Sequence, residues 1–376
     1  MQGAAGIDAS EIETPFALVD LDRVRANARR TVRSLAAHGL KWRPHVKTHK
    51  SRTIARLQVE AGASGLTVAT LHEAEAVRSL HGDLLLAHPQ VGVAKERRLS
   101  AFLEEQSLTI ALDSPQALQA ARRAAESARR AVGILVEVDV GMGRVGVTEP
   151  ETLVRLASLA RDGAYTFYRG ILFYPGHIRS AVAEQGSLVE ALSHRLESQL
   201  STLEAAGLSP EIVSGGSTPT LPRSHEVRGM TEVRAGTCIF HDRDSVATGA
   251  GSLDDVAYTV FATVVSTPRS GRVILDSGSK SLAREEYRGP PDAAGAGGYG
   301  LLPDHPGARI VSLSEEHAIV EAGASGWHPS VGDLVRVIPN HVCVSVNLQD
   351  HLFCAVEPHL TPIPIEGRGR HAPALP

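Results

Sequence analysis

The sequence predicts an α/β protein: a (β/α)8 barrel of the TIM type followed by an antiparallel β-domain. From Phe16 to about residue 245, short apolar β-rich runs alternate with Ala-, Arg- and Glu-rich helical stretches, which is the pattern of a parallel sheet. After the Gly- and Ser-containing segment 244–252, the predicted strands follow one another without helices, as in an antiparallel domain. A doubly wound open sheet is the alternative for the first part, because strand counts from a single sequence err easily.

The elements of the first part follow in a regular order. A helix is expected from Asp22 to Gly39, with Asp22 at its start and the glycine at its end. The expected strands are 40–46, 65–70, 83–87, 108–112, 133–140, 168–173, 211–214 and 232–237. Each but the last is followed by a helical stretch, such as 114–131 or 182–206, and eight such units favour a closed barrel.

The second part is expected to contain only strands. They are 256–266, 272–275, 310–312, 318–321, 334–339 and 343–347, separated by Gly, Pro and Asp. We therefore expect a barrel over 16–245 and a β-domain over 246–366, with residues 1–15 associated with the second domain. The Gly- and Pro-rich segment 289–300 is expected to be a mobile loop, and 367–376 a disordered tail.

Composition indicates an ordinary soluble globular protein. The 376 residues are 43% hydrophobic and 21% charged, with a formal net charge of -4. This charge and the low aromatic content of 4% argue against nucleic-acid binding. No apolar run reaches membrane-spanning length, and the first residues lack a signal-peptide pattern. Three cysteines are too few for a disulfide framework, so we expect a cytoplasmic protein.

The most informative segment is Arg43–Lys50, which places two lysines and two histidines where a buried strand is predicted to end. Ligands gather at the carboxyl ends of parallel strands, so a lysine here is well placed to meet one. Partial burial would lower the pKa of the amine and make it a nucleophile able to form a Schiff base. A solvated surface cluster that steers anions is the alternative.

Two glycine-containing segments are candidates for binding an anionic ligand. Segment 213–218 (Val-Ser-Gly-Gly-Ser-Thr) follows a late strand, and its glycines let main-chain amides approach an anion, with Gly236-Thr237 after the next strand. Segment 139–146 ends another strand and presents Arg144, which can bind a cofactor oxygen or a substrate carboxylate. The alternatives are a plain Gly/Ser turn and a structural ion pair.

Two further segments carry groups for metal binding and acid–base chemistry. On the strand expected over 343–347 and its approach, His341 and Cys343 would point to the same face, and both are good zinc ligands. Tyr174 and His177 close a predicted strand and place a phenol and an imidazole at the barrel mouth, where His177 can act as a base. The alternatives are a buried cysteine beside a core histidine, and a Pro-Gly turn with an exposed histidine.

Together these segments resemble the family of D-threonine aldolases and eukaryotic-type D-serine dehydratases, and the match covers nearly the whole chain. Members are pyridoxal-phosphate enzymes with an alanine-racemase-like barrel and a C-terminal β-domain. The segments that carry the resemblance are Thr14–Phe16, Arg43–Lys50, Thr67–Thr70 with Glu73–Glu75, His88–Gly92, Asp276–Lys280 and Pro339–Asn347.

The resemblance assigns roles residue by residue. It makes Lys47, rather than Lys50, the lysine that binds the cofactor, and it places Arg144 beside the phenolate oxygen. Tyr174 joins them as a cofactor-binding and catalytic residue. The expected phosphate and metal ligands are Ser214, Gly215, Gly216, Gly236 and Thr237 for the phosphate, and His341 and Cys343 for the metal. Cys238 stands where family members often have tyrosine, which puts that contribution in doubt.

The family resemblance implies a lyase that acts on D-β-hydroxy amino acids with pyridoxal phosphate and a divalent metal, for which zinc is favoured and manganese or magnesium are alternatives. Retro-aldol cleavage to glycine and an aldehyde is favoured, with His177 as the base. Dehydration to a keto acid and ammonia is the alternative, because a His-x-Cys pair looks more like the dehydratases. A racemase and a non-enzymatic cofactor carrier are more distant alternatives. Relatives of this architecture imply a homodimer.

Overall fold

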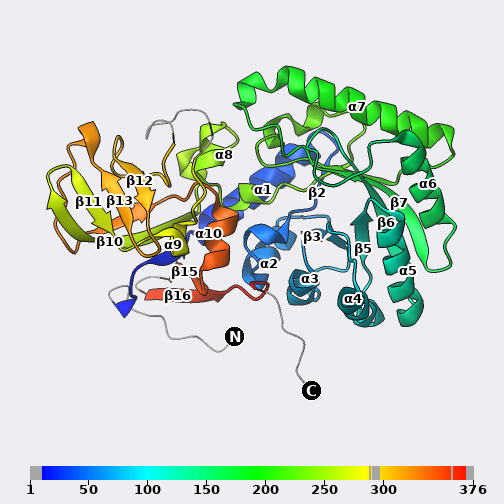
Figure 1. The fold of residues 1–376 in the computed structure, drawn as a ribbon, viewed down its shortest axis with the longest axis horizontal. Coiled ribbons are helices and arrows are strands. Elements are labelled where there is room, and N and C mark those ends of the chain that lie inside the picture. The colour runs from blue at the N-terminus through cyan, green and yellow to red at the C-terminus, as the bar shows by residue number, and fades with distance from the viewer. Residues whose placement is uncertain (1–10, 288, 290–296, 357–358, 370–376) are drawn as a thin grey trace. The chain divides into compact units, whose positions relative to one another are not determined.

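The computed structural model describes residues 11–287, 289, 297–356 and 359–369 (Figure 1). These residues form two compact units. The barrel unit contains Arg29–Gly236 and the described residues from Glu366 onward, and the β-unit contains the described residues up to Ala28 together with Thr237–Ile365. Helix α1 (Leu21–Ala36) crosses the boundary along the chain.

The barrel unit is built on an eight-stranded parallel sheet in the order β2-β9-β8-β7-β6-β5-β4-β3. Its strands are β2 (Lys41–Trp42), β3 (Leu66–Val68), β4 (Leu84–Leu86), β5 (Thr109–Leu112), β6 (Val132–Val138), β7 (Thr166–Phe173), β8 (Ile212–Gly215) and β9 (Glu232–Val233). Strands β3 to β6 are buried at every position, as expected for a parallel sheet covered on both faces.

Contacts between the two ends of this sheet close it into a barrel. Just after β2, His45 forms a parallel bridge with Thr67 of β3. The amide of Thr67 donates to the carbonyl of Pro44 at 2.9 Å, and the amide of Ser64 donates to the carbonyl of Trp42 at 2.8 Å. The predicted closed eight-stranded barrel is therefore confirmed. The last predicted strand, 232–237, is shorter than expected, because the chain turns into a 3-10 helix at Thr237–Ile239.

Helices alternate with the strands of the barrel unit. They are α2 (Arg52–Glu60), α3 (Leu71–Val77), α4 (Val93–Glu105), α5 (Pro115–Ala128), α6 (Pro150–Arg161) and α7 (Gly186–Ala205). Local signals explain several starts; Ser114, for example, accepts a hydrogen bond from the amide of Ala117 at the beginning of α5. The first helix differs in detail from the prediction. Asp20, not Asp22, accepts the amides at its start, at 2.9–3.0 Å.

The β-unit contains a second eight-stranded sheet, in the order β12-β13-β11-β10-β1-β15-β16, with β14 paired to β10. Its strands are β1 (Phe16–Val19), β10 (Tyr258–Arg269), β11 (Arg272–Leu275), β12 (Arg309–Leu313), β13 (Ala318–Glu321), β14 (Leu334–Val337), β15 (His351–Val356) and β16 (His359–Pro364). All pairs are antiparallel except β1 with β15. Short helices complete the unit: α8 (Arg243–Ala247), α9 (Ser279–Leu282) and α10 (Val342–Leu348).

One predicted strand of the β-unit is wrong: 343–347 lies in helix α10. Alternating valines favoured a strand, but Val342 and Val346 are both fully buried and lie four residues apart on one face of the helix. The carboxylate of Asp242 accepts the amide of Val342 at 3.0 Å and so starts the helix. Tertiary contacts therefore override the local preference.

Two expectations concern segments at the edge of the described chain. Residues 290–296 of the expected mobile loop and 370–376 of the expected tail lie outside the described residues. Residues 367–369, assigned to the same tail, are described and belong to the barrel unit. Within the described part of the chain, no helix is both long enough and apolar enough to cross a membrane.

Candidate functional site

The predicted cofactor residues of the barrel unit follow the carboxyl ends of five neighbouring strands. Lys47 follows β2, Arg144 follows β6 and Tyr174 follows β7, while Gly216 and Gly236 follow β8 and β9. These five strands are consecutive in the sheet, in the order β2-β9-β8-β7-β6. Since the strands are parallel, their carboxyl ends share one face of the barrel, where ligands bind in this architecture. The structure therefore brings the predicted residues to one side of the barrel mouth.

Lys47 lies on a 3-10 turn, Val46–Thr48, that we call the lysine turn. Its amide donates to Nδ1 of His45 at 3.4 Å, and its Nζ lies 5.7 Å from the centroid of the Tyr174 ring. Burial lowers the pKa of His45 well below its usual range, and the charges of Lys47 and Arg234 lower it further. The imidazole of His45 is therefore neutral, and its Nδ1 can accept the hydrogen bond that orients the lysine turn.

Lys50, the other lysine of the cluster, serves a different role. Its Nζ lies 3.6 Å from Oε1 of the buried Glu73, and its φ of 52° places it in the left-handed region. Glu73 in turn accepts the amide of Ala69 at 2.7 Å. The structure thus ties Lys50 to helix α3, and it leaves Lys47 as the lysine of this segment that lies over the Tyr174 ring.

The turn after β6 explains how Arg144 is presented. The carboxylate of Asp139 accepts the amides of residues 141–143 at 2.8–2.9 Å. Partial burial alone would raise the pKa of Asp139, but these three amides lower it overall, so the carboxylate stays ionised. Arg144 is exposed, and its Cζ lies 4.9 Å from the centroid of the Tyr174 ring. It also lies 4.0 Å from the buried carboxylate of Glu137.

His177, the predicted base, is exposed on the loop that follows β7. It lies beside the turn after β6, since a Cβ built at Gly141 would be 3.4 Å from its Nε2. Gly176 is required in the same loop, because a Cβ there would lie 2.2 Å from the ring of Tyr174. The structure therefore brings His177 and Tyr174 to the loop pair that presents Arg144.

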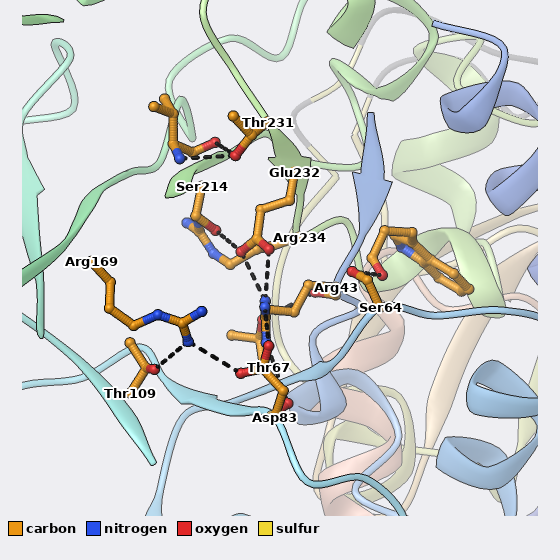
Figure 2. Close-up of polar contacts among 12 residues, drawn as sticks. Arg43, Ser64, Thr67, Asp83, Thr109, Arg169, Ser214, Thr231, Glu232 and Arg234 are labelled. Carbon is orange, nitrogen blue, oxygen red and sulfur yellow. Dashed lines mark hydrogen bonds and ion pairs between the residues drawn. The ribbon is translucent and has the colours of Figure 1, made fainter. Parts of the chain in front are cut away.

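Ser214 belongs to a buried ion network that sequence reasoning missed. Its hydroxyl donates to Glu232 at 2.7 Å and accepts from Arg234 at 2.9 Å, while Nε of Arg43 donates to both oxygens of Glu232 at 2.8 and 2.9 Å (Figure 2). The Ser214 side chain is thus engaged on both sides, so any contribution of this residue to a phosphate site would come from the main chain. Charged residues inside a predicted buried strand were the available signal.

Glycines are required at the ends of β8 and β9. A Cβ at Gly215 would lie 2.1 Å from the ring of Phe173, and Gly216 has a φ of 81°. A Cβ at Gly236 would lie 2.7 Å from Oγ1 of Thr48 and 2.8 Å from the carbonyl oxygen of His45. The segment after β9 therefore packs directly against the lysine turn, and a larger residue at position 236 would displace that turn.

One donor at this end of the barrel lacks a protein partner. Arg234 donates through one terminal nitrogen to the carbonyl of Phe173 at 2.8 Å, yet its buried Nε has no acceptor among the described residues. Burial lowers the pKa of Arg234 to about 10, so it remains cationic at neutral pH. Two arginines, one amine and glycine-lined turns form a site that fits an anionic cofactor with a phosphate and a phenolate, as pyridoxal phosphate has.

The β-unit holds the predicted metal ligands on the first turn of α10. His341 is the N-cap residue and Cys343 lies in the helix, so the pair converges at a helix start and not along a strand. The charge of Cys343 raises the pKa of His341 well above its usual range, and Asp242 adds to this effect although burial opposes it. Oγ1 of Thr237 lies 3.6 Å from Sγ of Cys343.

Asp242 is a candidate functional residue of the β-unit that sequence reasoning missed. It is fully buried, and its Oδ2 lies 3.4 Å from Nδ1 of His341. Its other oxygen accepts the amide of Ser245 at 2.9 Å, which caps helix α8. A carboxylate that holds one imidazole nitrogen leaves the other free for a metal. The only sequence signal was Asp at a helix N-cap, which is common for structural reasons alone.

The described part of the chain contains no group of three or more His, Cys, Asp or Glu side chains arranged to hold a metal. A metal at His341 and Cys343 would therefore have two protein ligands from this pair and open positions for other groups. An imidazole and a thiolate form a soft donor set that suits zinc, so the residues present fit the expected metal.

Comparisons with known proteins agree with this architecture. Residues 19–244 match the family model "Alanine racemase, N-terminal domain", and residues 257–355 match "Putative serine dehydratase domain". The chain is 33% identical to D-threo-3-hydroxyaspartate dehydratase of Delftia sp., over 89% of this chain and 92% of that protein. It is 30% identical to D-threonine aldolase of an Arthrobacter species, over 92% of this chain and 90% of that protein.

Solved structures support the same relationship. The Delftia dehydratase superposes with a TM-score of 0.82 and 29% identity, covering 95% of this chain and 98% of that one. D-threonine aldolase from Filomicrobium marinum shares the fold, with a TM-score of 0.85 and 24% identity over 98% of this chain and 99% of that one. The chain therefore belongs to the family of D-threonine aldolases and D-serine dehydratases, which are pyridoxal-phosphate-dependent lyases.

Proposed function

We propose that this protein is a pyridoxal-phosphate- and metal-dependent lyase that acts on D-β-hydroxy amino acids. The observation that carries the proposal is the gathering of Lys47, Arg144 and Tyr174 at the ends of neighbouring barrel strands, beside glycine turns that admit a phosphate. Pyridoxal phosphate, when bound, supplies an electron sink that weakens the bonds at the substrate's Cα. The protein's own residues then decide which bond breaks.

Each barrel residue has a proposed role that follows from its position. The amine of Lys47 would hold the cofactor and move the proton at the substrate's Cα. The turn that carries Lys47 is oriented by a hydrogen bond to the neutral His45. Arg144 would bind the phenolate oxygen and Tyr174 would pack beside it, since their groups are already 4.9 Å apart. The main chain of Gly215, Gly216 and Gly236, together with Thr237, would hold the phosphate.

His341 and Cys343 are proposed to bind a divalent ion, with zinc favoured. One solved D-threo-3-hydroxyaspartate dehydratase is a cysteine-to-alanine mutant in the metal-free form, and another is a histidine-to-alanine mutant. The two altered positions are two residues apart in that protein, as His341 and Cys343 are here. This shared spacing supports the assignment of the pair as metal ligands.

Within this class of reaction we propose dehydration to a keto acid and ammonia. Retro-aldol cleavage, which the sequence favoured, needs a base for the β-hydroxyl proton, and His177 on the loop after β7 is its candidate. The soft His341–Cys343 pair suits zinc, which can help a bound β-hydroxyl group to leave. The 33% identity to a dehydratase adds support, although the 30% identity to an aldolase is nearly as high. Aldol cleavage therefore remains the second candidate.

A product assay tests the proposal. The enzyme is loaded with pyridoxal phosphate and zinc and incubated separately with D-serine, D-threonine and D-threo-3-hydroxyaspartate. We expect a keto acid and ammonia; glycine and an aldehyde would instead establish the aldolase, and racemised substrate would establish a racemase. Unchanged turnover after verified removal of zinc by a chelator would contradict the metal role, and a Lys47→Ala protein that keeps the visible cofactor band would exclude Lys47.

We also propose a homodimer that works in the cytoplasm. No disulfide joins Cys238, Cys343 and Cys354, which is compatible with a reducing compartment. Light scattering coupled to size exclusion would test the oligomeric state, with a monomeric mass of 39.8 kDa contradicting the dimer.

A further inference from the structure

A short segment near the end of the described chain lies against the residues that follow the lysine turn. We call this segment, Glu366–Gly369, the C-terminal clasp. The amide of Gly367 donates to the carbonyl of Lys50 at 2.8 Å, and Oε2 of Glu366 accepts the amide of Arg52 at 2.9 Å. The clasp therefore holds the chain on both sides of Ser51. All of these residues belong to the barrel unit.

The clasp replaces the local cap of helix α2. Ser51 is the N-cap residue and serine is a preferred residue there, but its side chain makes no capping hydrogen bond. Its Oγ is buried and has no partner within the described residues. The acceptor for the first free amide of the helix comes instead from Glu366, which is 314 positions away along the chain. A carboxylate at this end also interacts favourably with the helix dipole.

Close packing fixes the clasp in place. A Cβ at Gly367 would lie 3.2 Å from the carbonyl oxygen of Lys50 and 3.3 Å from Cγ of Glu73, so this position has room only for glycine without local adjustment. The carbonyl of Arg368 lies 3.1 Å from Nε2 of His72, which is buried on helix α3. The clasp is thus anchored to α2 and α3 at the same time.

Lys50 links the clasp to the lysine turn. Its left-handed backbone conformation is strained for a residue other than glycine, so it persists only when its surroundings hold it. Its amide donates to the carbonyl of Val46 at 2.7 Å, which closes the turn that contains Lys47. The Gly367 bond holds the other side of the same residue. Releasing the clasp would therefore relax Lys50 and loosen the turn beside it.

We propose that the C-terminal clasp is a positioning element for Lys47, acting through Lys50. This proposal rests on the proposed function in one respect, because it takes Lys47 as the cofactor lysine. Loss of the clasp should lower cofactor affinity and raise local mobility of the lysine turn, while the distant helices of the barrel stay unaffected. The clasp contacts Lys50, Arg52 and His72, so its effect on Lys47 would be indirect.

The test compares two shortened chains and two full-length variants. One chain ends at Gly369 and keeps the clasp, and the other ends at Ile365 and lacks it; Glu366→Ala removes the capping oxygen and Glu366→Gln retains one. Amide hydrogen exchange is measured on peptides covering residues 46–52 and, as an internal reference, on helix α5. The dissociation constant for pyridoxal phosphate is measured from the visible absorbance of the reconstituted enzyme.

The chain ending at Ile365 and Glu366→Ala both lose a charge-assisted hydrogen bond, so we expect each to bind pyridoxal phosphate about tenfold more weakly. Amide hydrogen exchange should be faster in residues 46–52 and unchanged in helix α5. The chain ending at Gly369 should match wild type, and Glu366→Gln should lie between. Wild-type exchange at 46–52 in Glu366→Ala would overturn the proposal, whether or not the shortened chain folds. Amide hydrogen exchange is also measured without cofactor, so it tests the clasp whether or not Lys47 binds pyridoxal phosphate. The Lys47→Ala protein tests separately whether Lys47 is the cofactor lysine.

Discussion

Replacing Asp242 with asparagine should weaken metal binding by His341 and Cys343 while leaving the fold intact. The carboxylate of Asp242 accepts the amides of Val342 and Ser245, and it lies 3.4 Å from Nδ1 of His341. Asparagine has nearly the same shape and is itself a good N-cap residue. The variant therefore removes the negative charge and one acceptor without opening a cavity.

The structure sets the expected size of this effect. Donors surround both oxygens of Asp242, so the amide group of asparagine must face at least one donor in either orientation. Loss of a buried hydrogen bond to a charged group costs about 2 kcal/mol in the free energy of unfolding. Loss of the carboxylate that orients a metal-bound histidine costs roughly 10- to 100-fold in metal affinity. Metal affinity is thus the more sensitive readout.

Zinc affinity is measured by competition with a chromophoric chelator, and stability by urea unfolding of the metal-free protein. Asp255→Asn is the matched control, because Asp255 also accepts a main-chain amide, that of Ser252, in a capping box of the same unit. Cobalt substitution reports the coordination geometry through its visible spectrum. Zinc affinity and a cobalt spectrum identical to wild type in Asp242→Asn would refute the orienting role. A wild-type protein that binds no zinc would instead refute the metal site itself.

Three further predictions concern the barrel unit. Glu232→Gln should lower the free energy of unfolding by about 3 kcal/mol in urea titrations, because it breaks the buried ion pair with Arg43. Glu211→Gln, at an exposed ion pair, is the control and should lower it by less than about 1 kcal/mol. Equal losses in the two variants would contradict the buried network. Burial lowers the pKa of His49 to about 4, so the unfolded chain protonates this imidazole at a higher pH than the folded protein does. The free energy of unfolding should therefore fall by up to about 3 kcal/mol as pH drops from about 6.5 to about 4. His49→Asn should flatten this part of the pH dependence of unfolding, and an unchanged slope would argue against the assignment. Gly236→Ala should displace the lysine turn, because its Cβ would lie 2.7 Å from Oγ1 of Thr48. Pyridoxal-phosphate binding, measured by absorbance titration, should weaken at least about tenfold. Wild-type affinity would show that the turn adapts to the added methyl group.

Most of the barrel could be predicted because its elements follow local rules. Strands buried on both faces read as apolar runs, and helices between them carry their own start signals, as Ser114 does for α5. Three strands of the β-unit were harder. Strand β1 lies before the whole barrel in the chain but pairs with β10, and β15 and β16 have no strong local pattern. The pairings of β1 with β10 and β15 join segments that lie far apart along the chain.

The candidate site divides in the same way. Arg144, Tyr174, the glycines and the segment Arg43–Lys50 could be proposed because residues after parallel strands share one face, whatever their separation along the chain. The family resemblance then selected Lys47 over Lys50. Helix α10 was predicted as a strand because alternating valines favour that structure. Asp242 could not be proposed from the sequence, since nothing in its local sequence distinguishes a carboxylate that contacts His341 from an ordinary helix cap.

The sequence by itself determined which chemical groups are present, the alternation that builds a barrel and the strand ends at which ligands would bind. These depend on short-range periodicity and on the polarity of single residues. Only the tertiary structure decided that Lys50 is tied to Glu73 while Lys47 faces Tyr174, that Ser214 serves a buried ion network, and that a distant glutamate caps α2. A hydrogen bond or ion pair depends on distances of a few ångströms between residues far apart in the chain, and only the folded chain sets those distances.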